Sequence, residues 1–453
     1  MGLITSRVKL LWEWASTATS FSSQVSITIG TNIILASIGF ITGPISARLL
    51  QPEGRGELAA IQMWPSFFVL FALFGLPEAV VYFSAKKPQE SGQYMTTALI
   101  MSLIFSIPVF IVGYLLMPTL LAAQSPEIIL SAQWYLLYIL LYIVIITPLS
   151  LMRGIGEILL WNICRSFFTI MWVIALCIII FSRNLSAQLL ATVYLFLIGL
   201  SIFPIFFIIK KLKPSQFWPL IPGGWKPMIN YGYPLVLAGV PSRLNFSLDQ
   251  MIMAGLFSAK DLGLYVVALS WSWVSSPVID GIGKVLFPGT AAQVNKSLKL
   301  DYLTRATRLA SSLSFGLMVP LLFLTPIAIR LLFGMDFTEV IPTAMILVVA
   351  SAFFNIKVVL QEGARGLGNP RDVLWSECVG LITTGVMLLL LLNPLGLIGA
   401  AIASLISYMV NVAFLTWRIK ESVNCTISMV LIPQHSDVDI IKDKLIRILA
   451  RKR

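Results

Sequence analysis

Polar and charged side chains lie inside several long apolar segments of this chain, where a charge is costly and usually faces a cavity. A cluster mixing cationic, carboxylate and amide groups can bind a polar, anionic head group, because guanidinium and ammonium groups pair with phosphate. We therefore predict that these residues contact a substrate: Arg243, Asn245, Asp249, Gln250, Asp280, Lys284 and Lys357.

Four of these residues lie in the apolar segment 229–257. Arg243 and Gln250 are seven residues apart and share one helix face, whereas Asn245 and Asp249, four apart, share a neighbouring face. Arg243 lies near the middle of the segment and is the first candidate for contact with an anionic head group. The alternative is an internal pair between Arg243 and Asp249, or an acidic group on another helix, that holds the bundle together.

The remaining charges allow a structural role as well. Asp280 and Lys284, at positions i and i+4, can form an ion pair on a helix surface or line a gate. Lys357 lies near the end of its apolar segment. Arg165 and Glu377 occupy corresponding places in the two halves of the chain, which makes them candidate partners of each other.

Aromatic residues follow at the start of the apolar segment 262–287, namely Tyr265, Trp271 and Trp273. Aromatic rings at this position usually anchor a helix at the membrane surface. Stacking of the rings against a sugar is the alternative.

The composition supports a membrane protein with several spans. Of 453 residues, 11% are charged and the mean hydropathy is +0.89, whereas soluble domains carry about 25% charged residues. The net charge of +12 is not concentrated on a polar face with aromatic residues, so we expect no nucleic-acid partner. The four isolated cysteines and the single histidine give no disulfide framework, metal site or cofactor site.

The apolar segments predict twelve transmembrane helices, because each spanning helix needs about 20 mostly apolar residues. Lysine and arginine are concentrated in the loops on one side, which places both termini in the cytoplasm. The expected location is the plasma (inner) membrane. The predicted helices are 24–46, 59–83, 95–121, 129–151, 159–182, 187–209, 229–257, 262–287, 306–332, 338–360, 374–392 and 395–417.

Two short sequences are repeated six predicted helices apart. The motif RGIGE at 153–157 recurs as RGLGN at 365–369, and the loop at 47–61 matches the loop at 254–268, including the pair Gly56 and Gly263. The glycines of the first motif suit a tight turn with positive φ; gripping a phosphate is the alternative. Two six-helix bundles of the same orientation, related by a pseudo-twofold axis along the membrane normal, are therefore predicted.

This organisation predicts five regions along the chain. The two terminal regions include amphipathic stretches, 1–16 and 437–453, that suit the surface of an anionic membrane and could dock polysaccharide assembly enzymes. The regions are a cytoplasmic N-terminal interfacial segment (1–23), an N-lobe (24–209), a cytoplasmic linker (210–228), a C-lobe (229–417) and a basic cytoplasmic tail (418–453).

Four stretches carry a resemblance to a known family: 47–61, 74–87, 247–270 (SLDQMIMAGLFSAKDLGLYVVALS) and 285–293 (VLFPGTAAQ). The chain resembles bacterial polysaccharide flippases, the O-antigen and exopolysaccharide exporters of the multidrug/oligosaccharidyl-lipid/polysaccharide (MOP) superfamily. The resemblance implies a V-shaped pair of bundles with alternating access. It also implies transfer of a lipid-linked (polyprenyl-diphosphate) oligosaccharide from the cytoplasmic to the outer leaflet, for lipopolysaccharide or other surface polysaccharide.

Other functions remain open from the sequence. A cation-coupled multidrug antiporter of the same superfamily would need acidic rather than basic residues in the cavity. A polymerase or ligase would need a sizeable outer loop with catalytic groups, and the predicted outer loops are short, so we expect a transporter and not an enzyme. No GxxxxGK[ST] motif is present. The membrane potential, or entry of H⁺ or Na⁺ through Asp249 or Asp280, would then supply the energy.

Overall fold

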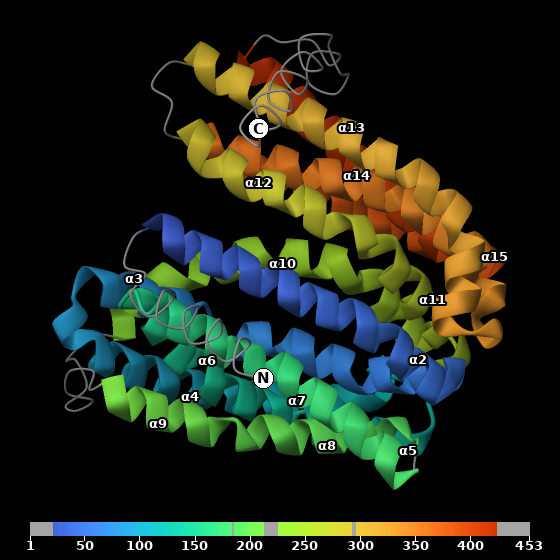
Figure 1. Ribbon diagram of the computed structural model, residues 1–453, viewed down its shortest axis with the longest axis horizontal. Helices are drawn as coiled ribbons and strands as arrows, with labels where there is room; N and C mark the ends of the chain where they lie inside the picture. The colour runs from blue at the N-terminus through green and yellow to red at the C-terminus, as the bar shows by residue number, and fades with distance from the viewer. Residues whose placement is uncertain (1–20, 184, 213–224, 292–295, 424–453) are drawn as a thin grey trace, which may run out of the picture. The chain divides into compact units, whose positions relative to one another are not determined.

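The computed structural model describes residues 21–183, 185–212, 225–291 and 296–423, and within them every regular element is a helix (Figure 1). The predicted all-α fold is therefore confirmed. The elements are α2 (Phe21–Leu73), α3 (Leu76–Lys86), η1 (Pro88–Glu90), α4 (Ser91–Leu120), α5 (Pro126–Tyr135), α6 (Leu137–Gly154), α7 (Ile158–Ser182), α8 (Ala187–Leu200), α9 (Ile202–Leu212), α10 (Trp225–Leu256), α11 (Ala259–Ser272), η2 (Trp273–Ser275), α12 (Ser276–Ala291), α13 (Lys296–Ala328), η3 (Ile329–Phe333), η4 (Met335–Val340), α14 (Ile341–Gly366) and α15 (Pro370–Val423).

The described part of the chain contains nine helical segments that are long and apolar enough to cross a membrane. Two of them, of 48 and 51 residues, lie in α2 and α15 and exceed the roughly 20 residues that one crossing needs. Each is interrupted by one residue with non-helical backbone angles, Gln51 in α2 and Gly396 in α15. Both are long enough to cross twice. The nine segments then give eleven crossings among the described residues, and α10, a helix of 32 residues that is not one of the nine, would be the twelfth. Twelve crossings stay a prediction.

The structure corrects the predicted limits of the first two helices. The predicted loop between these two helices, 47–58, is helical except at Gln51. A new helix begins directly after Gln51, where Pro52 fits the first helical turn. The second predicted helix, 59–83, is broken at Phe74 and Gly75, which both have positive φ. Three further predicted helices have a local irregularity, at Leu136, Ser201 and the 3-10 turn Trp273–Ser275, but each continues as one segment long enough to span a membrane.

The repeated motifs form the same turn twice. Gly156 and Gly368 have φ of 85° and 87°, in the left-handed region that glycine adopts readily. Each glycine N–H donates to the arginine carbonyl three residues earlier, at 3.4 Å from Arg153 and 3.0 Å from Arg365. The next N–H of each turn donates five residues back, which is the bonding pattern of a Schellman helix end. The prediction of a tight turn that needs positive φ is confirmed.

The chain divides into two compact units. Unit 1 comprises residues 1–240 and 251–263, and unit 2 comprises residues 241–250 and 264–453. Helix α10 contributes to both, so the units differ from a simple division at the predicted linker. The predicted lobes and the pseudo-twofold axis stay predictions. The terminal interfacial segments, and residues 213–224 of the linker, lie outside the described residues.

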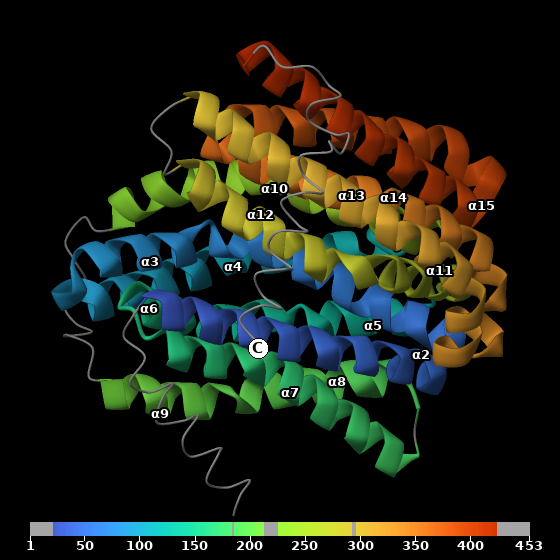
Figure 2. The same ribbon diagram turned by 45° about the horizontal axis from the view of Figure 1, so that its top comes forward.

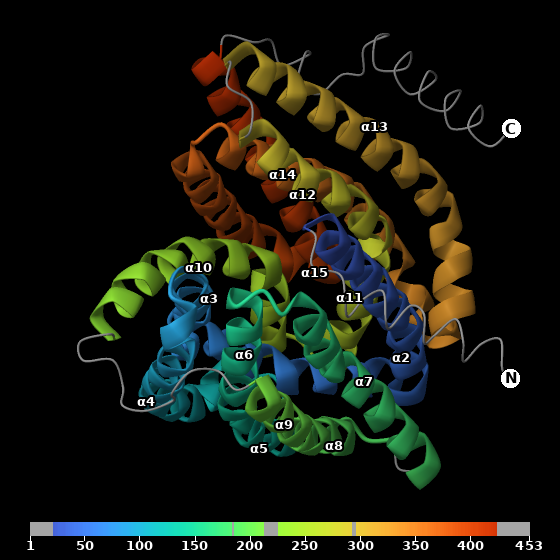
Figure 3. The ribbon, with the colours of Figure 1, turned by 60° about the vertical axis from the view of Figure 1, so that its left-hand side comes forward.

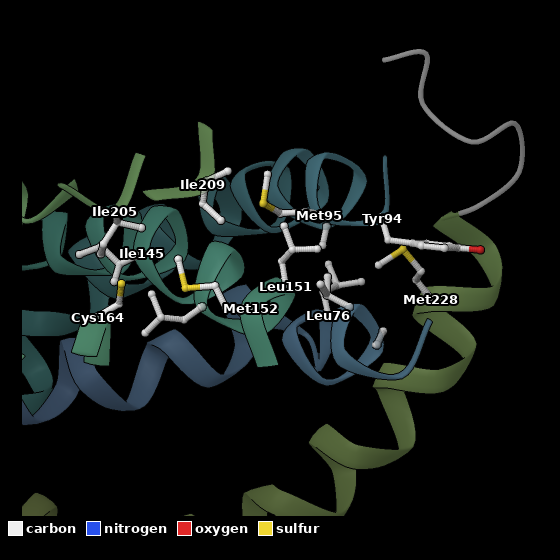
Figure 4. Packing of buried hydrophobic residues seen from close by; sticks show 14 of the residues in the cluster. Leu76, Tyr94, Met95, Ile145, Leu151, Met152, Cys164, Ile205, Ile209 and Met228 are labelled. Carbon is white, nitrogen blue, oxygen red and sulfur yellow. The ribbon is translucent and has the colours of Figure 1, made fainter. Parts of the chain in front are cut away.

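Unit 1 is built around a continuous apolar core. Helices α3, α4 and α6 pack side by side, as Figures 1 and 3 show, and α7, α9 and the start of α10 add to the same core. In Figure 4, Leu76 and Leu151 lie close together, with Met95 and Met152 nearby. Within a membrane, close van der Waals packing stabilises such a core, because the surrounding lipid is as apolar as the side chains themselves.

Unit 2 has its own core, formed where α12 and α13 pack against α14 (Figure 2). We call the parts of α15 before and after Gly396 its first and second limbs. The second limb completes this core through Val412, Leu415 and Ile419. The break at Gly396 makes this packing possible, because it lets the second limb of α15 turn back along the first.

Two glycines from the repeated loops approach each other within unit 1. A Cβ atom on Gly56 would overlap the carbonyl oxygen of Ala259, and a Cβ atom on Gly263 would overlap that of Pro52. The two contacts are reciprocal, since residues 52 and 56 match 259 and 263 at one constant offset. A local twofold relation would produce this reciprocity.

Candidate functional site

A buried ion pair lies at the centre of the polar groups in unit 2. The Lys357 ammonium is 2.8 Å from Oε1 of Glu377, and each side chain is only 3% exposed. An ion pair without water persists only when further hydrogen bonds satisfy its remaining polar atoms.

Amide groups supply those further bonds. Asn245 Nδ2 donates to Glu377 Oε2 at 2.8 Å, and Gln361 Nε2 donates to Glu377 Oε1 at 2.7 Å. The Asn245 carbonyl oxygen accepts from the hydroxyl of Thr384 at 3.0 Å. We call the group formed by Asn245, Lys357, Gln361, Glu377 and Thr384 the polar network.

Helical spacing explains how three helices supply this network. Lys357 and Gln361 are four residues apart on α14, and Glu377 and Thr384 are seven apart on α15, so each pair faces one way. Asn245 comes from α10. The second limb of α15 closes the network through Ser407, whose hydroxyl oxygen lies 2.8 Å from that of Thr384.

Asp249 is a second buried acid in unit 2, one helical turn from Asn245 on α10. It is 4% exposed. Its Oδ2 accepts from the hydroxyls of Tyr265 at 2.5 Å and Ser404 at 3.3 Å, and Oδ1 accepts from the backbone N–H of Gln250 at 2.8 Å. Among the described residues, no lysine or arginine lies within ion-pair distance of Asp249. Its charge is met by neutral donors.

Arg243 and Gln250 lie on a different face of α10 from the two buried residues, Asn245 and Asp249. Arg243 is exposed, and its guanidinium is 5.9 Å from the ring centre of Phe246. Gln250 is half-buried. Asp249 is bonded to hydroxyl groups instead of Arg243, so the internal pair considered from the sequence is not formed. Contact of Arg243 with a substrate stays a prediction.

The pair predicted on α12 is described only in part. Asp280 is half-buried, and the side chain of Lys284 lies outside the described residues. The structural and the gating interpretation of these two residues therefore both stay predictions.

Two of the three aromatic residues near the start of the 262–287 segment are buried and are not surface anchors. Tyr265 is fully buried and Trp271 is 5% exposed. The Tyr265 hydroxyl bonds to Asp249, and the Trp271 Nε1 donates to Thr325 at 2.9 Å. Trp273 packs on Phe246, with ring centres 4.4 Å apart. The anchoring prediction is wrong for Tyr265 and Trp271, whose rings are buried in unit 2, and stays a prediction for the half-buried Trp273.

The expected pairing of Arg165 with Glu377 is also wrong. Glu377 is paired with Lys357, and Arg165 donates to Asn32 at 2.5 Å. Sequence reasoning missed Gln361, although its spacing from Lys357 was a usable signal. It also missed the hydroxyl groups of α15, because serine and threonine are frequent in membrane helices and give no distinctive pattern.

The comparison with protein families identifies the chain. The profile of the polysaccharide biosynthesis protein family matches residues 22–294, which is more than half of the sequence. The chain belongs to this family. The match confirms the polysaccharide-biosynthesis part of the resemblance. A comparison with known proteins finds a relative, an uncharacterized membrane protein of Methanocaldococcus jannaschii. The two sequences are 22% identical over 420 residues, which cover 86% of this chain and 97% of that protein.

Solved structures show which fold this family member has. The lipid II flippase MurJ in an inward closed conformation matches with a TM-score of 0.72 at 15% identity, covering 86% of this chain and 87% of that one. An inward-facing multidrug resistance MATE transporter of the MOP superfamily matches with a TM-score of 0.68 at 14% identity, covering 86% and 98%. This member of the polysaccharide biosynthesis family is therefore a multi-pass membrane protein with the fold of flippases and transporters.

Proposed function

We propose that the chain is a flippase that moves a lipid-linked (polyprenyl-diphosphate) oligosaccharide from the cytoplasmic to the outer leaflet of the plasma membrane by alternating access. The observation that carries the proposal is the family match over residues 22–294 in a chain with a transporter fold. The oligosaccharide must cross hydrocarbon, where each unpaired polar group costs several kcal/mol. The polyprenyl tail can stay in lipid during this transfer.

Export of surface polysaccharide tests the proposal. In a strain that lacks this gene, we expect loss of the polysaccharide and accumulation of its lipid-linked precursor on the cytoplasmic side, both reversed by the wild-type gene. Electrophoresis of surface polysaccharide and mass spectrometry of extracted lipids measure the two effects. Undiminished polysaccharide without accumulated precursor would refute the proposal.

A multidrug antiporter is the second candidate, and one finding favours it. The charge of Lys357 is matched by Glu377, whereas Asp249 has no cationic partner among the described residues. Unit 2 is thus less basic than the sequence indicated, and an acidic site suits a cationic drug or a coupling cation. An ethidium-efflux assay separates the two functions, because efflux that depends on this gene would favour the antiporter.

Asp249 is the residue that we propose for energy coupling, by binding H⁺ or Na⁺. A buried acid inside a membrane protein costs energy unless it is neutralised, and either cation would do so. The membrane potential is the other source, since it gives about 2.3 kcal/mol per charge per 100 mV to an anion moving outward.

We expect the Asp249→Asn variant to lose dependence on an imposed H⁺ or Na⁺ gradient, because the amide keeps the shape but takes up no cation. Transport of fluorescent lipid-linked oligosaccharide in proteoliposomes measures this dependence. Asp336→Asn, at an exposed aspartate of η4, is the control and should behave as wild type. Gradient-driven transport that is unchanged in Asp249→Asn would show that Asp249 is not the coupling residue. Wild-type transport that responds to neither gradient would leave the membrane potential as the energy source.

A further inference from the structure

Unit 1 contains two arginines near one tryptophan ring. The guanidinium of Arg165 lies 4.5 Å from the ring centre of Trp161, and that of Arg153 lies 5.8 Å from it. Both distances are within the range of cation–π attraction. Trp161 and Arg165 are four residues apart on α7, while Arg153 is in the last turn of α6.

Helix α2 forms the other wall of this cluster. Asn162 Nδ2 donates to Thr28 Oγ1 at 3.1 Å, and Arg165 Nη2 donates to Asn32 Oδ1 at 2.5 Å. These bonds fix the guanidinium of Arg165 between α2 and α7, which pack against each other in unit 1 (Figure 3). The cluster has a defined shape on three helices.

The positive charge in this cluster is not balanced. Among the described residues, no carboxylate forms an ion pair with Arg153 or Arg165. The buried Nε of Arg165 has no hydrogen-bond partner there either. A guanidinium inside a membrane protein with only an amide oxygen and an aromatic face is left short of a negative partner. An anion placed between the arginines would supply it.

We propose that Arg153, Trp161, Arg165 and Asn32 form a binding site for the phosphate of a lipid head group. The planar fork of a guanidinium matches phosphate oxygens in two parallel hydrogen bonds, and its unused donors remain available here. Arg153 is exposed and Arg165 half-buried, so the site leads from the end of α6 into the helices. That end is the one predicted to face the cytoplasm.

Two lipids carry this chemistry: a polyprenyl diphosphate and an anionic phospholipid. Binding of a phospholipid would be independent of the proposed transport function. Binding of a polyprenyl diphosphate would extend the proposed function and rests on it, because the site would then receive the substrate before transfer.

Lipid binding to the purified full-length protein tests the site. Native mass spectrometry would compare undecaprenyl diphosphate, phosphatidylglycerol and the net-neutral phosphatidylcholine. We expect Arg165→Gln to raise the Kd of the bound anionic lipid by about tenfold or more, since hydrogen bonds to charged groups are of this strength. Arg165→Lys should recover part of the affinity, because it keeps the charge but loses the fork.

Matched variants make the result decisive. Arg183→Gln, at an exposed arginine at the other end of α7, should bind as wild type. Arg153→Gln changes an exposed residue, so its lipid Kd provides a second test of the site if Arg165→Gln fails to fold. An effect on undecaprenyl diphosphate alone identifies the substrate phosphate, and an effect on phosphatidylglycerol identifies a phospholipid site. Unchanged Kd values for both lipids in folded Arg165→Gln or Arg153→Gln, or equal losses in Arg183→Gln, would overturn the inference even if export requires the gene.

Discussion

Replacing Glu377 with glutamine should strongly destabilise the protein, by about 3–5 kcal/mol, because the change leaves the Lys357 ammonium buried without its counter-charge. The pair has 3% exposure on each side, so water cannot replace the lost carboxylate. Thermal unfolding of the purified protein in detergent should show a large fall in Tm. Export should fall with the amount of folded protein.

A double variant separates the charge effect from the loss of shape. Lys357→Met combined with Glu377→Gln removes both charges, and we expect it to recover most of the lost Tm. The control is Glu362→Gln, which breaks the more exposed pair between Glu362 and Arg365 and should cost at most about 1 kcal/mol. A Glu377→Gln variant that melts at the wild-type temperature would show that the pair does not hold unit 2 together.

Adding one methyl group at Gly263 should have the second large effect. Its Cβ would overlap the carbonyl oxygen of Pro52, and neither backbone can move away as a flexible side chain could. Overpacking usually costs about 1–3 kcal/mol, and we expect Gly263→Ala at or above the upper end of that range. The yield of monodisperse protein and its Tm measure the effect.

The reciprocal contact provides a paired test. Gly56→Ala should be as harmful as Gly263→Ala, because its Cβ would overlap the carbonyl oxygen of Ala259. Gly281→Ala and Gly39→Ala are the controls, since a Cβ at either position meets no atom within 4 Å. If Gly263→Ala were as stable and as active as these controls, the close approach of the two repeated loops would not matter for folding.

The contrast between the two polar groups in unit 2 bears on transport. The polar network satisfies its charges internally and fixes α10, α14 and α15 to one another. Asp249 has only neutral donors, so binding of a cation would change its electrostatics most. Stability and coupling would then depend on neighbouring residues of α10, Asn245 and Asp249, and Asp249→Asn can be compared with Glu377→Gln to separate the two roles.

The sequence alone predicted the features that depend on local physics. Long apolar segments identify membrane helices because hydrocarbon admits only backbones with satisfied hydrogen bonds. The repeated glycines predicted two turns with positive φ, since few other residues adopt that conformation readily. The charges inside the apolar segments were visible because they are rare there.

Only the tertiary structure decided which of these charges meet. Helical spacing shows which residues share a face, but it does not say which helix that face meets. The sequence therefore offered no sign that Glu377 is the ion-pair partner of Lys357, and it paired Arg165 with the wrong acid. The break at Phe74 and Gly75 was equally hidden, because an apolar segment has the same composition whether it continues straight or bends. Partner choice depends on packing between helices distant in sequence, and a single sequence carries no direct record of that packing.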